Sequence, residues 1–190
     1  MKTIYYTATS LDGFIADSNN SLDWLLQLGE PGKSHQEFLA GVGALAMGST
    51  TYEWLLDNHV RPDGENPQPW PYEQPSWVFT SRSLRGAPGA DIRFVGGDVR
   101  PAHREMLAAA DGKNVWLVGG GELVGRFHDH GLLDEIIVQV APVTLGAGAP
   151  LLPRRIVVPP MRLVSVDIMG DSLAELRYEV RRAATFGSGE

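Results

Sequence analysis

The sequence predicts an α/β fold with a central, mostly parallel sheet that ends in an antiparallel pair of strands. Up to residue 140, short apolar runs alternate with amphipathic segments, which is the pattern of strands joined by helices. Two later segments, residues 161–168 and 174–180, instead alternate apolar and polar residues, as expected of a neighbouring antiparallel pair. The sheet is therefore expected to be mixed.

The first half of the chain is expected to supply three strands and two helices. Residues 2–9 are rich in β-branched and aromatic side chains, whereas residues 10–20 are rich in Asp, Ser, Asn and Gly, which predicts a strand followed by a loop. Ser34 is placed to cap a helix that carries Phe38 and Leu39. The other expected elements are a strand at 44–47, a helix from 48 to 56, a proline-rich loop at 61–75 and a strand at 77–79.

The second half continues the alternation. Pro101 stands near the first turn of a predicted helix over residues 101–110, a position that proline favours. The other expected elements are a strand at 92–95, a strand at 115–118, a helix at 123–130, a strand at 135–140 and a Gly/Pro-rich loop at 142–153.

Composition limits the classes of function. The chain has 190 residues and a net charge of −7, and no basic stripe is available to neutralise nucleic-acid phosphates. It has no cysteine, which excludes thiolate chemistry and fits a cytoplasmic protein. His35, His59 and His103 are scattered, and His128 and His130 would point about 200° apart on a helix. No apolar stretch approaches the roughly 20 residues of a membrane span. We expect one domain over residues 1–182, a disordered tail at 183–190, and no nucleic acid, membrane or metal as partner.

The most informative segment is residues 115–124, where an apolar run stops at Gly119, Gly120 and Gly121 before an amphipathic run begins. This order predicts a strand, a tight turn and a helix. Backbone N–H groups without neighbouring Cβ atoms can approach a ligand closely, and the positive end of the helix dipole favours an anion there. A tight connection without a ligand is the alternative. The G-x-G-x-x-G fingerprint of doubly wound dehydrogenases is not met, because Val124 stands where the third glycine belongs.

Two more predicted strands end in glycine or small polar residues, at 48–51 and at 80–82. Because parallel strands end at the same edge of a sheet, these segments and the glycine turn are expected to converge. Their agreement predicts an enzyme that uses a nucleotide cofactor.

Five motifs in order along the chain resemble the dihydrofolate reductase superfamily, and more closely the branch that contains the RibD C-terminal domain, the reductase part of a riboflavin-biosynthesis enzyme. The motifs are S-L-D-G-x-x-A at 10–16, M-G-x-x-T-[WY] at 47–52, the turn at 79–82, V-G-G-G at 118–121 and A-P-x-x-L-G-x-G-x-x-L at 141–151. The resemblance covers about residues 3–180. It depends on all five motifs occurring in this order, since no single motif is decisive.

The resemblance implies a three-layer α/β/α fold of the dihydrofolate reductase type, NADPH as cofactor, a cis peptide at Gly119–Gly120 and a homodimer. It implies that Arg82 reads the 2′-phosphate of the cofactor, for which an Arg fork is suited, although a solvated charge is the alternative. The cofactor-binding residues that it implies are Ala8, Ile15, Gly48, Ser49, Thr50, Thr51, Thr80, Ser81, Arg82, Val118, Gly119, Gly120, Gly121, Glu122 and Leu123.

The expected reaction is transfer of a hydride from NADPH to a C=N or C=O carbon of a heterocyclic substrate of the ribosylamino-pyrimidine type. Asp12 is the expected catalytic residue and would help to deliver a proton, although an Asp-Gly pair is also a common turn. Arg154 and Arg155 are candidates for holding a substrate phosphate. The expected substrate-binding residues are Phe14, Trp24, Leu145, Gly146 and Gly148.

Two other functions remain open. The first is a pteridine or dihydrofolate reductase, although Glu30 and Glu37 are poorly placed to supply the carboxylate that binds a pterin. The second is a non-catalytic nucleotide-binding module. The zinc signature of the deaminase half of the bifunctional riboflavin enzyme needs cysteines, so a stand-alone reductase-like domain is expected.

Overall fold

The computed structural model of the chain describes residues 1–29, 33–170 and 172–182. Its helices are α1 (Asp23–Leu26), α2 (Lys33–Ala40), α3 (Ser49–Leu55), α4 (Val99–Ala109) and α5 (Gly121–Asp129), and a π-helical turn at Leu56–Val60 continues α3. The strands of the main sheet are β1 (Thr3–Thr9), β3 (Val42–Gly48), β4 (Ser76–Phe79), β5 (Ile92–Val95), β6 (Asn114–Gly119), β7 (Glu135–Val140), β9 (Arg162–Met169) and β10 (Leu173–Glu179). The tail expected at residues 183–190 lies outside the described residues.

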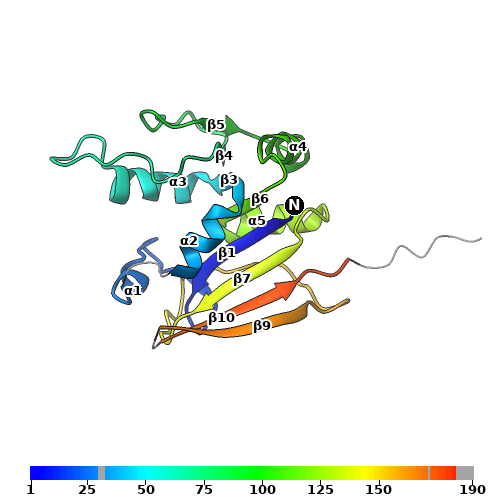
Figure 1. Cartoon of the computed structure of the whole chain (residues 1–190). Coiled ribbons are helices and arrows are strands. Elements are labelled where there is room, and N and C mark those ends of the chain that lie inside the picture. Colours follow the sequence, from blue (N-terminus) through cyan, green and yellow to red (C-terminus); the bar gives the residue numbers. More distant parts are fainter. Residues whose placement is uncertain (30–32, 171, 183–190) are drawn as a thin grey trace, which may run out of the picture.

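These strands form one sheet in the order β5-β4-β3-β6-β1-β7-β10-β9 (Figure 1). All pairs from β5 to β7 are parallel, and β10 pairs antiparallel with both β7 and β9. The predicted mixed sheet with an antiparallel C-terminal pair is thus confirmed. Each predicted strand is present, with ends that differ from the sequence-based ranges by at most two residues.

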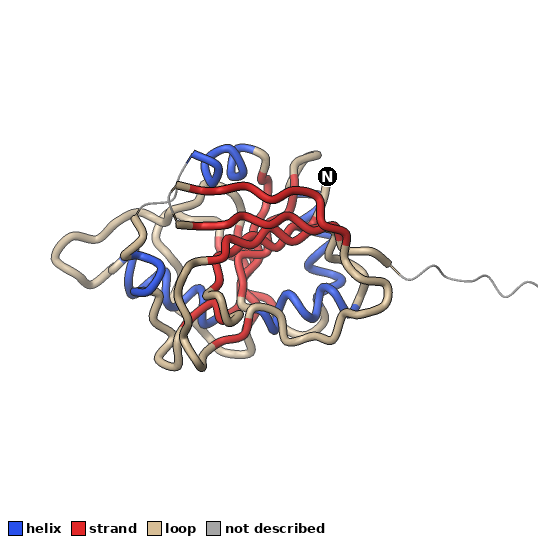
Figure 2. Tube along the Cα trace, turned by 90° about the horizontal axis from the view of Figure 1, so that it is seen from below, coloured by secondary structure: helices blue, strands red, loops and turns tan. Residues whose placement is uncertain are grey.

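Side chains of alternate strand residues point to opposite faces of the sheet, and each face carries its own buried core. On one face, Phe127 of α5 and Tyr5 of β1 belong to one buried cluster, to which α4 also contributes. On the other face, Phe38 of α2 packs against Trp116, and Tyr52 of α3 packs in an adjoining cluster. Figure 2 shows the strands in the middle, with helices on both sides. The structure is therefore the three-layer α/β/α arrangement that was expected.

A second, two-stranded sheet was not predicted. β2 (Phe14–Ala16) pairs antiparallel with β8 (Ala149–Pro150), so the expected loops at 10–20 and 142–153 are tied to each other. Gly148 permits this approach, because its φ is +150° and a Cβ atom there would lie 2.0 Å from the carbonyl oxygen of Ala16. Strands of two or three residues are too short to leave a periodic signal in a sequence, and the four-residue helix α1 was missed for the same reason.

At the centre of the sheet the strand order reverses, because β3 leads to β4 on one side and β6 leads to β7 on the other. β3 and β6 are neighbours, but α3 leaves β3 on the face that carries α2, whereas α5 leaves β6 on the opposite face. A crevice therefore opens beyond the carboxyl ends of these two strands, which is where open α/β sheets bind ligands. None of the helices in the described part of the chain has the length and apolar character needed to cross a membrane.

Candidate active site

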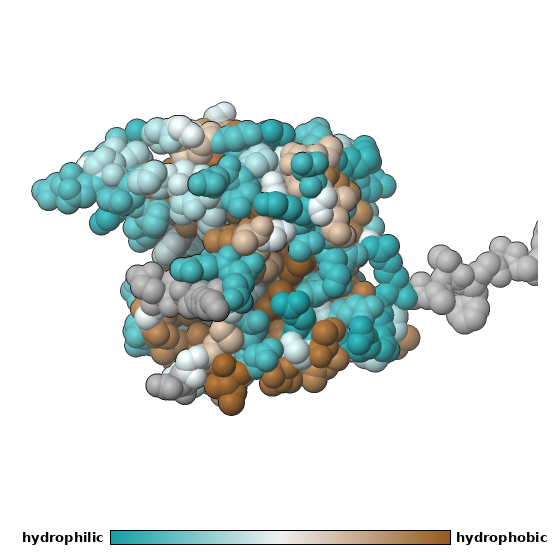
Figure 3. All heavy atoms as spheres, in the orientation of Figure 1, coloured by the Kyte–Doolittle hydropathy of each residue, from teal (hydrophilic) through white to brown (hydrophobic). Residues whose placement is uncertain are grey.

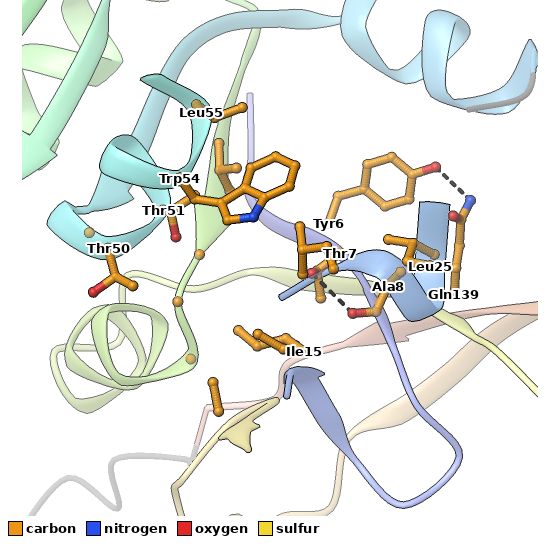
Figure 4. Close-up of a pocket in the computed structure, with 18 of the residues that line it drawn as sticks. Tyr6, Thr7, Ala8, Ile15, Leu25, Thr50, Thr51, Trp54, Leu55 and Gln139 are labelled. Atoms are coloured by element: carbon orange, nitrogen blue, oxygen red, sulfur yellow. Dashed lines mark hydrogen bonds between the residues drawn. The ribbon is translucent and has the colours of Figure 1, made fainter. Parts of the chain in front are cut away.

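A cavity of about 1040 Å³ lies at this crevice (Figure 4). Its volume is at the upper end of the range for small-molecule and cofactor sites, roughly 300–1,000 Å³. Its walls come from β1, β3, β6 and β7 and from the first turns of α3 and α5. Twelve of the fifteen residues predicted to bind the cofactor line it: Ala8, Ile15, Gly48, Ser49, Thr50, Thr51, Val118, Gly119, Gly120, Gly121, Glu122 and Leu123.

Two helices begin at the cavity with glycine as the capping residue. Gly48 caps α3 and Gly120 caps α5, and neither helix receives a side-chain hydrogen bond at its cap. The two turns touch, because a Cβ atom on Gly48 would lie 3.8 Å from the carbonyl oxygen of Gly119. Backbone N–H groups of the first helical turns are thus available to an anion from both sides, as the phosphates of a dinucleotide require.

Close packing leaves no room for a side chain at the second turn. A Cβ atom on Gly121 would lie 2.4 Å from the carbonyl oxygens of Pro150 and Leu151. Gly119 has a φ of +138°, which other residues rarely adopt, and the Gly119–Gly120 peptide bond is cis, as the resemblance implied. The residues present therefore fit a backbone-lined phosphate site.

The third predicted segment lies beside the cavity and does not line it. Phe79 at the end of β4 does line it, whereas Thr80, Ser81 and Arg82 follow outside. The Arg82 guanidinium, about half exposed, makes a two-pronged ion pair with Glu53 of α3, with Nη1–Oε1 and Nη2–Oε2 distances of 3.1 and 2.5 Å. Arg82 is thus held near the rim of the site by a carboxylate.

The opposite end of the cavity is formed by side chains that the sequence reasoning missed. Gln139 Nε2 donates to the hydroxyl of Tyr6 at 2.7 Å and to Glu175 Oε2 at 2.9 Å. Burial first, and the Glu175 carboxylate second, raise the pKa of Tyr6 to about 12, so this hydroxyl keeps its proton at neutral pH. Figure 4 shows Tyr6 and Gln139 on the side of the cavity away from Thr50 and Thr51.

The sequence does contain a pattern that indicates the Tyr6–Gln139 end of the cavity. Gln139 is a polar residue that directly follows the apolar run at 136–138 of β7, and a half-buried polar side chain at such a position is an informative exception. Tyr6 lies two residues before Ala8 on β1 and therefore on the same face of the sheet. The other lining residues that were missed include Thr7, Leu25, His35 and Trp54.

Asp12 has a different surrounding from the one expected. It is exposed and does not line the cavity. Ser10 Oγ donates to its Oδ1 at 2.6 Å, and the backbone N–H groups of Leu145 and Gly146 donate to the carboxylate at 3.0 and 2.7 Å. These hydrogen bonds, with that of Ser10 the largest cause, lower the pKa of Asp12 to about 2. At neutral pH it is an ionised group that anchors a loop.

The expected substrate-binding residues Phe14, Trp24, Leu145, Gly146 and Gly148 also stand outside the lining. Phe14 belongs to β2, and the other loop residues belong to the turn that Asp12 and β2 hold in place. Trp24 is buried at 8 % exposure, whereas its neighbours Leu22, Leu25 and Leu26 face the cavity.

Arg154, which was a candidate for binding a substrate phosphate, is ion-paired with two carboxylates. Its guanidinium contacts Glu122 and Asp129 at 2.8–3.1 Å and lies against Gly125 of α5. Arg154 therefore fastens the segment after β8 to α5.

These features define the class. The fold has three layers, with helices on both faces of one mixed sheet, and two glycine-capped helices begin where the strand order reverses. This is a dihydrofolate reductase-like fold. The chain belongs to the RibD C-terminal domain family, whose pattern matches residues 1–173.

Relatives and solved structures agree with this membership. The chain is 35% identical over 156 residues to the uncharacterized protein YwjB of Bacillus subtilis, covering 79% of this chain and 82% of YwjB. A protein of Shewanella sp. PV-4, provisionally assigned to riboflavin biosynthesis, matches 96% of this chain and 100% of its own with a TM-score of 0.76 and 27% identity.

Two more distant structures share the fold. One is the diaminohydroxyphosphoribosylaminopyrimidine deaminase/5-amino-6-(5-phosphoribosylamino)uracil reductase of Thermotoga maritima, with a TM-score of 0.64 and 18% identity over 94% of this chain and 56% of that chain. The other is dihydrofolate reductase of Enterococcus faecalis complexed with NADP(H), with a TM-score of 0.60 and 12% identity over 94% of this chain and 95% of that chain.

Proposed function

We propose that this protein is an NADPH-dependent reductase that delivers a hydride to a C=N or C=O carbon of a heterocyclic substrate related to the ribosylamino-pyrimidines. The observation that carries the proposal is the meeting of two glycine-capped helix starts at one cavity of about 1040 Å³. The names of two proteins that share the fold support it, because one is a phosphoribosylaminouracil reductase and the other is a reductase complexed with NADP(H).

The coenzyme would be held mainly by backbone. The first turns of α3 and α5, at Ser49–Thr51 and Gly121–Leu123, would receive its phosphates, and Ala8 and Ile15 would pack against the nicotinamide ring. Thr80, Ser81 and Arg82 would contact the adenosine end with its 2′-phosphate. The coenzyme supplies the hydride when it is bound, while the protein orients the reactants and excludes water.

Asp12 is proposed to contribute to the reaction indirectly, by holding a loop beside the site in place. Its carboxylate anchors the N–H groups of Leu145 and Gly146, so it fixes a loop next to the site. With a pKa of about 2, it is a weak candidate for donating a proton at neutral pH.

The test combines binding with turnover. Titration with NADPH, followed by calorimetry, should give saturable one-to-one binding. NADPH oxidation should then be followed with 5-amino-6-(5-phosphoribosylamino)uracil, with its dephosphorylated form and with dihydrofolate. Oxidation with either pyrimidine supports the proposal. Oxidation with dihydrofolate alone would make the protein a folate-type reductase, and binding without oxidation by any of the three would make it a nucleotide-binding module.

A homodimer is part of the proposal. β9 is an edge strand on which Val166 and Ile168 are 57% and 84% exposed, and Figure 3 shows apolar side chains along the lower edge of the molecule, where Figure 1 has β9. An uncovered apolar edge strand is a liability for a monomer. Light scattering should give twice the monomer mass for the wild type and the monomer mass for Ile168→Lys. A monomeric wild type contradicts the dimer.

A further inference from the structure

Carboxylates gather in a second hollow beside the end of the cavity that lies away from the glycine turns. A second hollow of about 500 Å³ shares Tyr6, Ser34 and Met169 with the first, so the two are neighbours with a common wall. The carboxylates that line this second hollow are those of Glu37, Asp167 and Glu175. A molecule that extended from the coenzyme past Tyr6 would therefore meet negative charge.

The register of the strands explains why the carboxylates gather here. Ala8 of β1 pairs with Gln139 of β7, Gln139 pairs with Glu175 of β10, and Glu175 pairs with Asp167 of β9. Cross-strand partners point to the same face of a sheet, so the row runs from the expected nicotinamide wall to two acidic groups. Like charges directly opposite each other on antiparallel strands are destabilising, which is a cost that a binding role would explain.

Within the described part of the chain, two arginines supply the positive charge at the two hollows, one at each. Of the described side chains that line the two hollows, Arg126 and Arg177 carry a permanent positive charge. The Arg126 guanidinium donates to the carbonyl oxygen of Gly97 and lies 5.7 Å from the ring of Phe79 on β4. Four strand spacings separate β4 from β7, which is roughly 19 Å. Arg126 therefore belongs to the coenzyme end.

The cation near the carboxylates is already paired. Arg177 Nη1 lies 3.2 Å from Glu135 Oε1, and Glu135 is 3% exposed. His35, which also lines the cavity, has its pKa lowered by burial, so it is neutral at pH 7. Recognition of a phosphate usually employs Arg or Lys in direct contact, and the described side chains at this end supply no unpaired one.

We propose that the substrate of this reductase carries no phosphate group, and that Glu175 is the residue that selects for its absence. The inference rests on the proposed function and narrows its substrate class to neutral or cationic heterocycles. Gln139 fixes Glu175 at the junction of the two hollows, where its carboxylate accepts a hydrogen bond from an N–H or O–H group of the substrate. A phosphate at the same place would be repelled by Glu175 and Asp167, and among the described side chains it would find no unpaired cation to replace its hydration.

The test uses a pair of probes that differ by the phosphate alone: 5-amino-6-(5-phosphoribosylamino)uracil and its dephosphorylated form. Binding of each probe is measured by calorimetry on protein saturated with NADP⁺, so that no turnover occurs. We expect the dephosphorylated probe to bind the wild type about tenfold more tightly or better, because like-charge contacts oppose the other probe. Glu175→Gln should reduce this preference to about twofold or less, and Glu175→Lys should reverse it.

Glu179→Gln is the matched control, because Glu179 lies on the same strand and pairs with Arg162 outside the cavity. It should keep the preference of the wild type. The inference is contradicted if the wild type prefers the phosphorylated probe, binds both equally or binds neither, or if Glu175→Gln leaves the preference unchanged. Titration with NADPH distinguishes failure of the proposed function from failure of this inference. A protein that does not bind NADPH contradicts the proposed function. A protein that binds NADPH normally but prefers the phosphorylated probe contradicts only this inference.

Discussion

The two ends of the cavity are made of different parts of the chain. At the proposed coenzyme end the groups that face the cavity are largely backbone, because Gly48, Gly119, Gly120 and Gly121 have no side chains to cover it. At the other end the groups are the side chains of Tyr6, Gln139 and the neighbouring leucines. A backbone site needs glycine at fixed positions and so leaves a motif, whereas a side-chain site depends on which strands become neighbours.

The largest effect is expected from filling the backbone end. Gly121→Val should destabilise the protein by about 3 kcal/mol or more and abolish NADPH binding, because its Cβ would lie 2.4 Å from two carbonyl oxygens that cannot rotate away. Thermal denaturation and NADPH calorimetry measure both losses.

Gly86→Ala is the control for this change, since a Cβ atom there meets nothing within 4 Å. It should leave both quantities nearly unchanged. A stable Gly121→Val protein that binds NADPH normally would remove the glycine turn from the site.

The second change addresses the side-chain end alone. Gln139→Leu removes the donor shared by Tyr6 and Glu175, which should cost about 1–3 kcal/mol of stability. It should also lower kcat/KM by about tenfold or more, because the Glu175 carboxylate is no longer fixed. The dissociation constant of NADPH should stay within about twofold of the wild type. A large loss of NADPH affinity would show that the two ends are not separate.

A smaller effect is expected at the rim of the coenzyme end. If Arg82 reads the 2′-phosphate, Arg82→Ala should weaken NADPH binding by about tenfold and leave NADH binding nearly unchanged. Arg85→Ala is the matched control, because Arg85 has the same exposure of 55% and also pairs with one carboxylate, that of Asp63. Equal losses for NADPH and NADH would mean that Arg82 acts only through its ion pair with Glu53.

The smallest effect concerns Asp12 and its pH dependence. Its pKa of about 2 lies below its usual value near 4, so the stabilisation from its hydrogen bonds is complete above that usual value and is lost as the pH falls through about 2. Between pH 5 and 9 neither stability nor kcat should show a step from Asp12.

Asp12→Asn should therefore lower kcat by a few-fold, about two to five, through the loosened loop, while the shape of its pH profile stays that of the wild type. Asp17→Asn serves as the control, because Asp17 caps a turn in the same region through Asn19 and Ser21. Loss of a limb of the pH profile in Asp12→Asn alone would restore Asp12 as the proton donor.

Much of the fold could be predicted because its elements carry strong local patterns. The apolar runs of β3, β6 and β7 and the glycine that precedes α5 each have a physical cause that a single sequence displays. The β2–β8 pair escaped because it joins residues more than a hundred positions apart through very short strands. Asp12 illustrates the same limit, since its partners at Leu145 and Gly146 lie in that distant loop.

The sequence by itself determined the α/β class, the strand ends where glycine must stand and the glycine turns that line one end of the cavity. Steric exclusion of a Cβ atom and the period of apolar residues act over a few neighbouring positions, which is why a single sequence displays them. Only the tertiary structure decided that Ala8, Gln139, Glu175 and Asp167 form one row, that Arg154 and Arg82 are already paired with carboxylates, and that Asp12 faces a loop. Strand order and register set these contacts, and they depend on how the whole core packs rather than on any short segment.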